Sequence, residues 1–133
     1  MRCFIDSNIL FSAGLFPNGV VAAALIKAFT PPNEVVVSDY SLDEVRRAVA
    51  RKFPHKVNEL ETFLYRILFT AQLVVTQEEE FEDETAVRDI KDRPILRAAR
   101  HAKVDVLITG DKDLLEAGIT DPQIMDHLEF LKL

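Results

Sequence analysis

The sequence lacks the features that define several large classes of protein. Its 133 residues include a single cysteine, Cys3, which excludes an internal disulfide framework and a cysteine-rich zinc site. No apolar run approaches the ~18 residues that a membrane-spanning helix needs. The opening MRCFIDSNIL reaches an acidic residue at position 6 and leaves no room for a signal peptide, so we expect a cytoplasmic protein with no membrane partner. No GxxxxGK(S/T) loop is present, which argues against a nucleoside triphosphatase.

Positive charge and stacking aromatics are also scarce. The chain has 16 Lys+Arg against 22 Asp+Glu, a net charge of −6, so it cannot hold nucleic acid by bulk positive charge. Tryptophan is absent, and most of the nine phenylalanines lie in apolar runs, so no platform for base stacking is evident. A polyanionic partner would therefore have to be bound by local groups of basic residues.

Short apolar runs alternate with longer segments of helical periodicity, a pattern typical of βα units around a mostly parallel sheet. The expected strands are Cys3–Ile5, Val35–Val37, Leu73–Val75, Val106–Ile108 and Gln123–Met125. The expected helices are Gly19–Phe29, Leu42–Lys52 after Ser41, His55–Ala71 with Pro54 in its first turn, Arg93–Lys103, and a short helix from Lys112 or Asp113 that stops at Gly118. Without repeats or a Gly/Ser linker, residues 1–133 are expected to form one domain. The acid-rich stretch Glu78–Glu84 fits either a helical turn or a loop.

Four acidic residues lie just after expected strands or at the starts of expected helices. Asp6 directly follows the first strand, Asp111 follows the fourth strand after a short turn, and Glu44 and Asp92 lie at helix starts. Because strand ends and the following helix starts share one edge of a parallel sheet, we expect the four carboxylates to converge there. Close carboxylates repel one another and lose hydration, and Mg²⁺ or Mn²⁺ would relieve this cost while leaving positions for a phosphate substrate. The arrangement therefore points to metal-dependent phosphoryl chemistry.

Each of these acids also has an ordinary structural role open to it. Glu44 fits a capping box with Ser41, in which its side chain bonds back to the Ser41 amide. Asp6 can close a turn. The remaining acids can cap the helices that follow them, a role open to Asp92, Asp111 and Asp113. Only the expected convergence at one edge favours the metal site.

Four blocks of sequence carry a recognisable pattern. They are FIDSNIL from Phe4, SLDEV from Ser41, DIKDRPILRAA from Asp89 and LITGDKDLL from Leu107. In order and spacing they resemble the PIN-domain nuclease family, and within it the VapC-like toxins of toxin–antitoxin pairs. The resemblance covers essentially the whole chain. It implies a three-layer α/β/α sandwich around a mostly parallel sheet of about five strands, and a metal-dependent endoribonuclease activity.

The resemblance also implies roles for individual residues. Metal ligands for one or two Mg²⁺ or Mn²⁺ ions are expected at Asp6, Glu44, Asp92 and Asp111, with Asp113 as a frequent additional ligand and Asn8 and Thr109 as polar supports. Ser7 stands where the family usually has threonine, which keeps the hydroxyl. Asp89 is an alternative third acid, and we favour Asp92 because it directly precedes the expected helix start. A metal-activated water would then hydrolyse the RNA phosphodiester without a covalent intermediate.

Two groups of basic residues begin near the acidic edge. One follows Glu44 and the other follows Asp92 on one side of a helix. The candidate contacts to an RNA backbone are Arg46, Arg47, Arg93 and Arg97, with Arg51, Lys52, Lys56 and Arg100 in the same groups. Ordinary solvated helix faces are the alternative interpretation.

Two other functions are consistent with parts of the sequence. A phospho-receiver signalling domain has acids at strand ends and a lysine that Lys112 would supply, but it normally needs an acidic pair beside the first strand, where Asp6 is followed by Ser7 and Asn8. A catalytically inactive PIN-like binding module is the third possibility, and the four filled acidic positions argue against it. The resemblance further implies a homodimer and a small antitoxin partner that covers the active edge.

Overall fold

Five parallel strands form the centre of the molecule. A computed structural model, which describes residues 1–133, places β1 (Arg2–Ile5), β2 (Glu34–Ser38), β3 (Gln72–Val74), β4 (Val106–Ile108) and β5 (Gln123–Met125) in the order β3-β2-β1-β4-β5. Every neighbouring pair is parallel. The chain extends the sheet from β1 through β2 to β3 on one side, and then adds β4 and β5 on the other. The strand order therefore reverses between β1 and β4, where parallel sheets usually bind their ligands.

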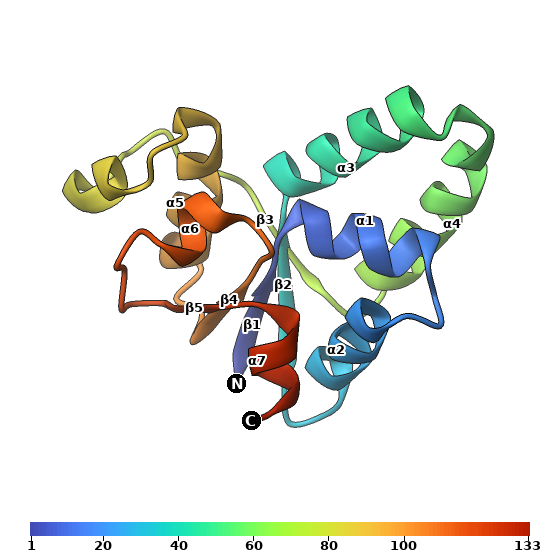
Figure 1. The fold of residues 1–133 in the computed structure, drawn as a ribbon, viewed down its shortest axis with the longest axis horizontal. Helices are drawn as coiled ribbons and strands as arrows, with labels where there is room; N and C mark the ends of the chain where they lie inside the picture. Colours follow the sequence, from blue (N-terminus) through green and yellow to red (C-terminus); the bar gives the residue numbers. More distant parts are fainter.

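Helices cover both faces of this sheet (Figure 1). One face is covered by α1 (Ser7–Leu15), α2 (Val20–Phe29), α3 (Asp39–Lys52), α4 (Val57–Leu68) and α7 (His127–Leu131), and the other by α5 (Arg93–His101) and α6 (Lys112–Leu115). Successive strand side chains alternate between the two cores, so Cys3 and Ile5 belong to one and Phe4 to the other. The predicted three-layer α/β/α class with a five-stranded sheet is confirmed.

Two helices, α1 and α7, were not expected from the sequence pattern. In α1 the residues SNILFSAGL show little separation of polar and apolar faces. The helix lies between α2, α3 and α4, so it meets apolar neighbours on several sides. A helix buried in this way has no polar stripe, and its periodicity is therefore invisible in the sequence. Asp6 is its N-cap, so the predicted turn at this position is the start of a helix.

The start of α3 differs from the prediction in a way that affects Glu44. The helix begins at Asp39, directly after β2, because the Ser38 hydroxyl accepts a hydrogen bond from the Ser41 N–H at 3.1 Å and caps it. Ser41 is a buried helix residue and not the cap. Glu44 therefore lies in the second turn, and the capping box with Ser41 is not formed.

Smaller boundary differences have local causes. Pro54 opens the 3₁₀ turn η1 (Pro54–Lys56) instead of the first turn of α4. The helix α5 ends at His101, since Lys103 has a φ of 54°, in the left-handed region. Gly118, with a φ of 74°, lies in the turn beyond α6 and is not its immediate C-terminal glycine.

The acid-rich stretch Glu78–Glu84 lies against α5 and leads into the 3₁₀ helix η2 (Glu82–Ala86). Glu84 is buried, and its Oε1 lies 2.9 Å from Nη2 of Arg97 on α5. Asp83 forms an ion pair with Arg100, one turn further along. The stretch is thus held by ion pairs to α5, and a second 3₁₀ turn, η3 (Ile90–Asp92), connects it to that helix.

No single helix is long and apolar enough to cross a membrane. Taken together, α1 and α2 have the length and composition of a membrane-spanning segment, but the two helices are bent by 113° relative to each other.

Candidate functional site

The acids expected to converge do meet at the carboxyl edge of the sheet. Asp6 follows β1, Asp111 follows β4, Glu44 projects from α3, and Asp92 ends η3. Their charges act on one another: Asp111 affects the pKa of Asp6, and Asp6 and Asp111 affect those of both Glu44 and Asp92. The structure therefore places all four predicted carboxylates at the edge where the strand order reverses, although the acids whose oxygens all lie within 4.8 Å of one another are Asp89, Asp92 and Asp113.

Asp6 is the most enclosed and most firmly held of the four. Its Oδ1 accepts a hydrogen bond from the Ser7 N–H at 2.6 Å, and its Oδ2 accepts one from the Thr109 hydroxyl at 2.7 Å. The Asn8 amide donates to the same Oδ2 at 3.3 Å. Because β1 and β4 are neighbours, residues 103 positions apart in the sequence can fix one carboxylate.

The same polar residues reach the Asp111 turn. The Asn8 Oδ1 accepts the Gly110 N–H at 3.0 Å, and the Thr109 Oγ1 accepts the Asp111 N–H at 3.0 Å. Asn8 and Thr109 thus contact both acidic strand ends, which is the arrangement expected of supporting residues. Their role in binding a metal stays a prediction.

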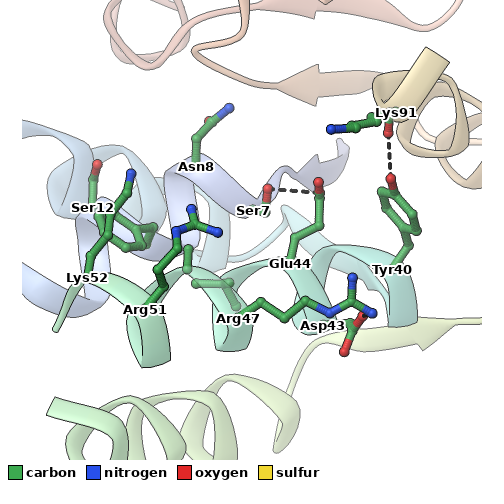
Figure 2. A pocket seen from close by; sticks show the side chains of 13 residues that line it. Ser7, Asn8, Ser12, Tyr40, Asp43, Glu44, Arg47, Arg51, Lys52 and Lys91 are labelled. Carbon is green, nitrogen blue, oxygen red and sulfur yellow. Dashed lines mark hydrogen bonds and ion pairs between the residues drawn. The ribbon is translucent and has the colours of Figure 1, made fainter. Parts of the chain in front are cut away.

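Ser7 links Asp6 to Glu44. Its Oγ lies 3.1 Å from Glu44 Oε1 (Figure 2) and 3.4 Å from Asp6 Oδ1. A hydroxyl at this position is sufficient for the contact, so the serine in place of the usual threonine preserves it. Glu44 is therefore held toward the site by a side chain from another element and does not cap its own helix.

Asp111 caps α6, as one of the ordinary roles predicted, because its Oδ1 accepts the Asp113 N–H at 2.9 Å. Asp92 makes no capping hydrogen bond, in contrast to the N-cap role considered for it. Asp89 caps η3 through the Lys91 N–H at 3.0 Å.

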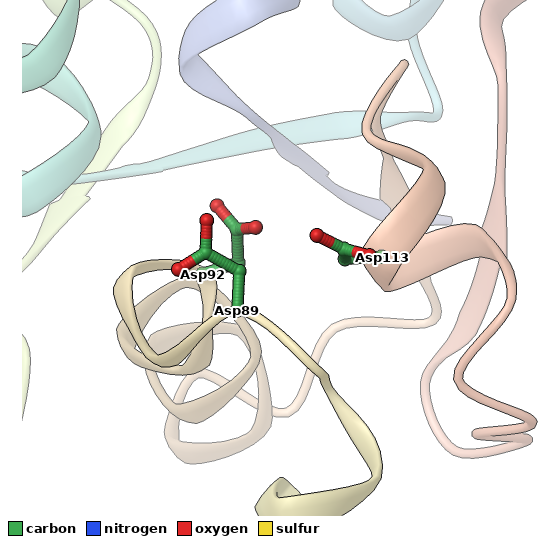
Figure 3. A group of neighbouring side chains, drawn as sticks. All are labelled: Asp89, Asp92 and Asp113. Carbon is green, nitrogen blue, oxygen red and sulfur yellow. The ribbon is translucent and has the colours of Figure 1, made fainter.

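Carboxylate oxygens of Asp89, Asp92 and Asp113 all lie within 4.8 Å of one another, with Asp113 facing the other two (Figure 3). Either Asp89 or Asp92 is therefore near enough to be the third acid, and Asp92 is the one whose carboxylate is not engaged in capping.

Burial and mutual repulsion disfavour the ionised forms of these acids. Desolvation raises the pKa of Asp6, with the charge of Asp111 adding to it, while hydrogen bonds from Thr109 and Ser7 oppose the shift. Desolvation and then the charge of Asp6 raise the pKa of Glu44. Desolvation, followed by the hydrogen bond and charge of Asp111, raises the pKa of Asp92 to about 8. No positive charge is among the causes that would favour ionisation of Asp6 or Asp92. A hard divalent cation, which takes oxygen ligands, would supply that charge.

We expect the metal-free protein to be more stable at pH 5 than at pH 8. The folded-state pKa of Asp92, about 8, lies above its ordinary value of 3.8, so folding favours the protonated carboxyl. This contribution to stability is complete below about pH 3.8 and is lost as the pH rises through 8. Thermal unfolding in EDTA should give a Tm several degrees lower at pH 8 than at pH 5. Asp92→Asn should reduce the difference, and an equal difference in that variant would contradict the assignment.

A groove of about 620 Å³ extends from Glu44 along α3 (Figure 2). Basic side chains line it: Arg47, Arg51 and Lys52 on α3, and Lys91 near Tyr40 on the opposite wall. Arg47 also forms an exposed ion pair with Asp43 at 2.5 Å. The groove joins the acidic edge to a row of positive charge, as the basic residues after Glu44 led us to expect.

The other predicted basic contacts are engaged within the protein. Arg46 points to α4, where its Nε lies 2.8 Å from Glu61 Oε1. Arg93 donates from Nε to the Val87 carbonyl at 3.0 Å. Arg97 is mostly buried beside Glu84. Contact of these three with RNA stays a prediction, and Arg47 is the predicted residue that lies in the groove.

Sequence reasoning missed three side chains at the site. They are Tyr40 and Lys91, which line the groove, and Arg88, whose Nη2 lies 2.9 Å from Asp113 Oδ1. Each contact joins residues more than 20 positions apart or lies in irregular chain. No local pattern could have indicated them.

Comparison with known proteins places this geometry in a family. The sequence matches the PIN domain over residues 2–113. No curated protein matches the chain significantly. Solved structures with a similar fold include the VapBC2 complex of Rickettsia felis bound to promoter DNA, at 14% identity and a TM-score of 0.71, covering 95% of this chain and 98% of that one.

Two further structures give similar values. The VapC20 toxin of Mycobacterium tuberculosis, which cleaves the sarcin–ricin loop, has 15% identity and a TM-score of 0.62, covering 88% of this chain and 95% of its own. VapBC-1 of Haemophilus influenzae has 15% identity and a TM-score of 0.63, covering 96% and 99%. These likenesses show the fold, and the match over residues 2–113 establishes that this chain belongs to the PIN-domain family.

Proposed function

We propose that this protein is a metal-dependent endoribonuclease and the toxin of a toxin–antitoxin pair, with residues 1–133 acting as one nuclease domain. The observation that carries the proposal is the convergence of Asp6, Glu44, Asp92 and Asp111 beside a groove lined by basic side chains. Carboxylates alone would repel an RNA backbone, whereas carboxylates that hold divalent cations attract it.

Different residues of the chain would bind the metal and orient its ligands. Asp6 and Asp111, both held by hydrogen bonds at strand ends, would provide the rigid side of a Mg²⁺ or Mn²⁺ site. Glu44 and Asp92 would complete it from α3 and η3, with Asp113 close by. One or two ions bound there would supply an activated water and neutralise charge at the phosphodiester. Asn8, Thr109 and Ser7 would keep the ligand oxygens oriented.

The groove suggests how RNA would reach the acids. Arg47, Arg51 and Lys52 follow one another along α3, so a single strand lying in the groove would meet a positive charge at each turn while its phosphodiester approached Glu44. No tryptophan is available for stacking. Backbone contact is therefore expected to dominate, and to give a strong dependence of binding on salt concentration.

The proposed partners follow from the similar structures. Two of them are VapBC complexes and one is a VapC toxin that cleaves the sarcin–ricin loop. We propose a small antitoxin as partner, together with a homodimer. Exposed apolar side chains on α2 and just after α4, including Val20, Ile26 and Phe69, support the presence of a protein-binding surface.

We expect the purified protein to cleave single-stranded RNA with Mn²⁺ or Mg²⁺ and to lose this activity in EDTA, with recovery when the metal is restored. Gel analysis of a labelled RNA would measure this. Cleavage that continues unchanged in EDTA would contradict metal dependence. Labelling by an acyl phosphate without RNA cleavage would favour the phospho-receiver alternative, and RNA binding without cleavage at any metal concentration would favour an inactive binding module.

A further inference from the structure

We propose that Tyr40 is a positioning residue that holds Asp92 in the site, an inference that rests on the proposed function. Tyr40 lies in the first turn of α3, one turn before Glu44, and its hydroxyl donates to the Lys91 carbonyl at 2.6 Å (Figure 2). The bond spans 51 positions of sequence. It joins the helix that carries Glu44 to the 3₁₀ turn that ends at Asp92.

The peptide unit that Tyr40 contacts is the one that leads into Asp92. This unit contains the Lys91 carbonyl and the Asp92 N–H, and that N–H donates to the Asp89 carbonyl at 3.1 Å. Both polar groups of a single planar peptide are thus engaged, one by Asp89 within the turn and the other by Tyr40 from across the groove. The α-carbon of Asp92 is attached directly to this fixed plane.

Asp92 depends on its backbone more than the neighbouring acids do. The carboxylates of Asp6 and Asp111 accept backbone hydrogen bonds, and the Glu44 carboxylate accepts a hydrogen bond from the Ser7 hydroxyl. Asp92 has no capping bond of this kind, and the side-chain partner that it does have, Asp111, is another acid. The direction of its carboxylate therefore depends on where η3 lies, and the hydrogen bond from Tyr40 holds η3 on the side facing α3.

The neighbouring residue Asp39 supports the other end of the same connection. Its Oδ1 accepts the Thr76 N–H at 2.9 Å and the Thr76 hydroxyl at 2.7 Å, just after β3. The first turn of α3 therefore holds both the beginning and the end of the largely irregular segment 76–91. Of the two residues, Tyr40 acts at the end next to Asp92.

Tyr40→Phe tests this role because it removes only the hydroxyl. We expect Mn²⁺ affinity, measured by titration calorimetry or by the electron paramagnetic resonance of free Mn²⁺, to fall roughly 3- to 10-fold, the range for losing one hydrogen bond. RNA cleavage should recover at saturating Mn²⁺, and the Tm in EDTA should fall by no more than a few degrees, since the hydrogen bond is solvent-exposed. The matched control is Tyr65→Phe, since Tyr65 is the only other tyrosine and its exposed ring contacts Phe69 edge to face.

A double variant separates positioning from a general structural effect. If Tyr40 acts through Asp92, adding Tyr40→Phe to Asp92→Asn should cause no further loss of Mn²⁺ affinity. A further loss of the same size as in the single variant would overturn the inference, as would unchanged affinity in Tyr40→Phe or an equal loss in Tyr65→Phe.

Measurements of Mn²⁺ binding and RNA cleavage by the unmodified protein distinguish failure of this inference from failure of the proposed function. Absence of Mn²⁺ binding and of RNA cleavage by that protein would overturn both. Normal binding and cleavage that depend on Asp6 but not on Tyr40 would overturn the inference and leave the proposed function supported.

Discussion

Replacement of Asp6 by asparagine is expected to reduce metal-dependent RNA cleavage by more than about 100-fold, since even residues that only support metal ligands typically contribute 10- to 100-fold. Asp6 is buried and accepts hydrogen bonds from Ser7, Thr109 and Asn8. Asparagine keeps the shape and can still cap α1, because Asn and Asp are equally good N-caps. The variant should therefore fold while losing one negative ligand at the centre of the site. Initial rates of cleavage at several Mn²⁺ concentrations would measure the effect.

Asp126→Asn provides a matched control for this experiment. Asp126 also follows a strand, β5, and caps a short helix, with its Oδ1 accepting the Glu129 N–H at 2.8 Å. It is not among the charged neighbours that shift the pKa of Asp6, Glu44 or Asp92. We expect cleavage within about 2-fold of the unmodified protein. Equal activity in Asp6→Asn, Asp126→Asn and the unmodified protein would show that the acidic edge is not the site of catalysis.

The largest loss of stability is expected for Arg97→Ala. The side chains of Arg97 and Glu84 are 12% and 3% exposed, and the guanidinium lies 2.9 Å from the carboxylate. Removing the arginine leaves a buried Glu84 with only the Phe81 N–H, at 2.7 Å, as a donor. Breaking a buried ion pair by removing one partner costs about 3–5 kcal/mol. Urea unfolding should therefore show the free energy of unfolding reduced by about 3 kcal/mol.

Two comparisons test the physical reason for this loss. Arg47→Ala breaks a pair whose side chains are 76% and 55% exposed, so we expect a change below about 1 kcal/mol. Arg97→Met combined with Glu84→Leu removes both charges, and the double variant should be more stable than Arg97→Ala. If Arg97→Ala instead kept full stability and lost RNA affinity, Arg97 would be an RNA contact, as the sequence pattern predicts.

The acid-rich stretch illustrates how a sequence pattern can be incomplete. The helical spacing of Arg93, Arg97 and Arg100 indicated a basic face available to RNA, and the clustered acids of Glu78–Glu84 had no assigned role. In the structure two of these arginines pair with Glu84 and Asp83. The basic residues and the acidic residues therefore neutralise one another. This pairing becomes apparent only when the fold places residues 78–84 along α5.

The sequence by itself determined the strands, their layering and the set of acidic residues. Strands buried on both faces are runs of apolar residues such as Val35–Val37, and this signal is local. Asp6 follows β1 directly and Asp111 follows β4 after the turn Thr109–Gly110, so their convergence required only the parallel arrangement that the alternation predicts. The helix α1 could not be predicted from the sequence pattern, because burial on several sides removes the polar stripe of a surface helix.

Only the tertiary structure decided which side chains hold the acids and which basic residues line the groove. Ser7 reaches Glu44, Thr109 reaches Asp6 and Tyr40 reaches the turn before Asp92, over 37, 103 and 51 positions. Arg47 lines the groove while its neighbour Arg46 turns to Glu61. Such pairings depend on the distance between elements after folding, which a strand or helix pattern does not contain. The local order of the chain therefore determined at which edge the acidic residues lie, and the packing of its elements determined how each carboxylate is held.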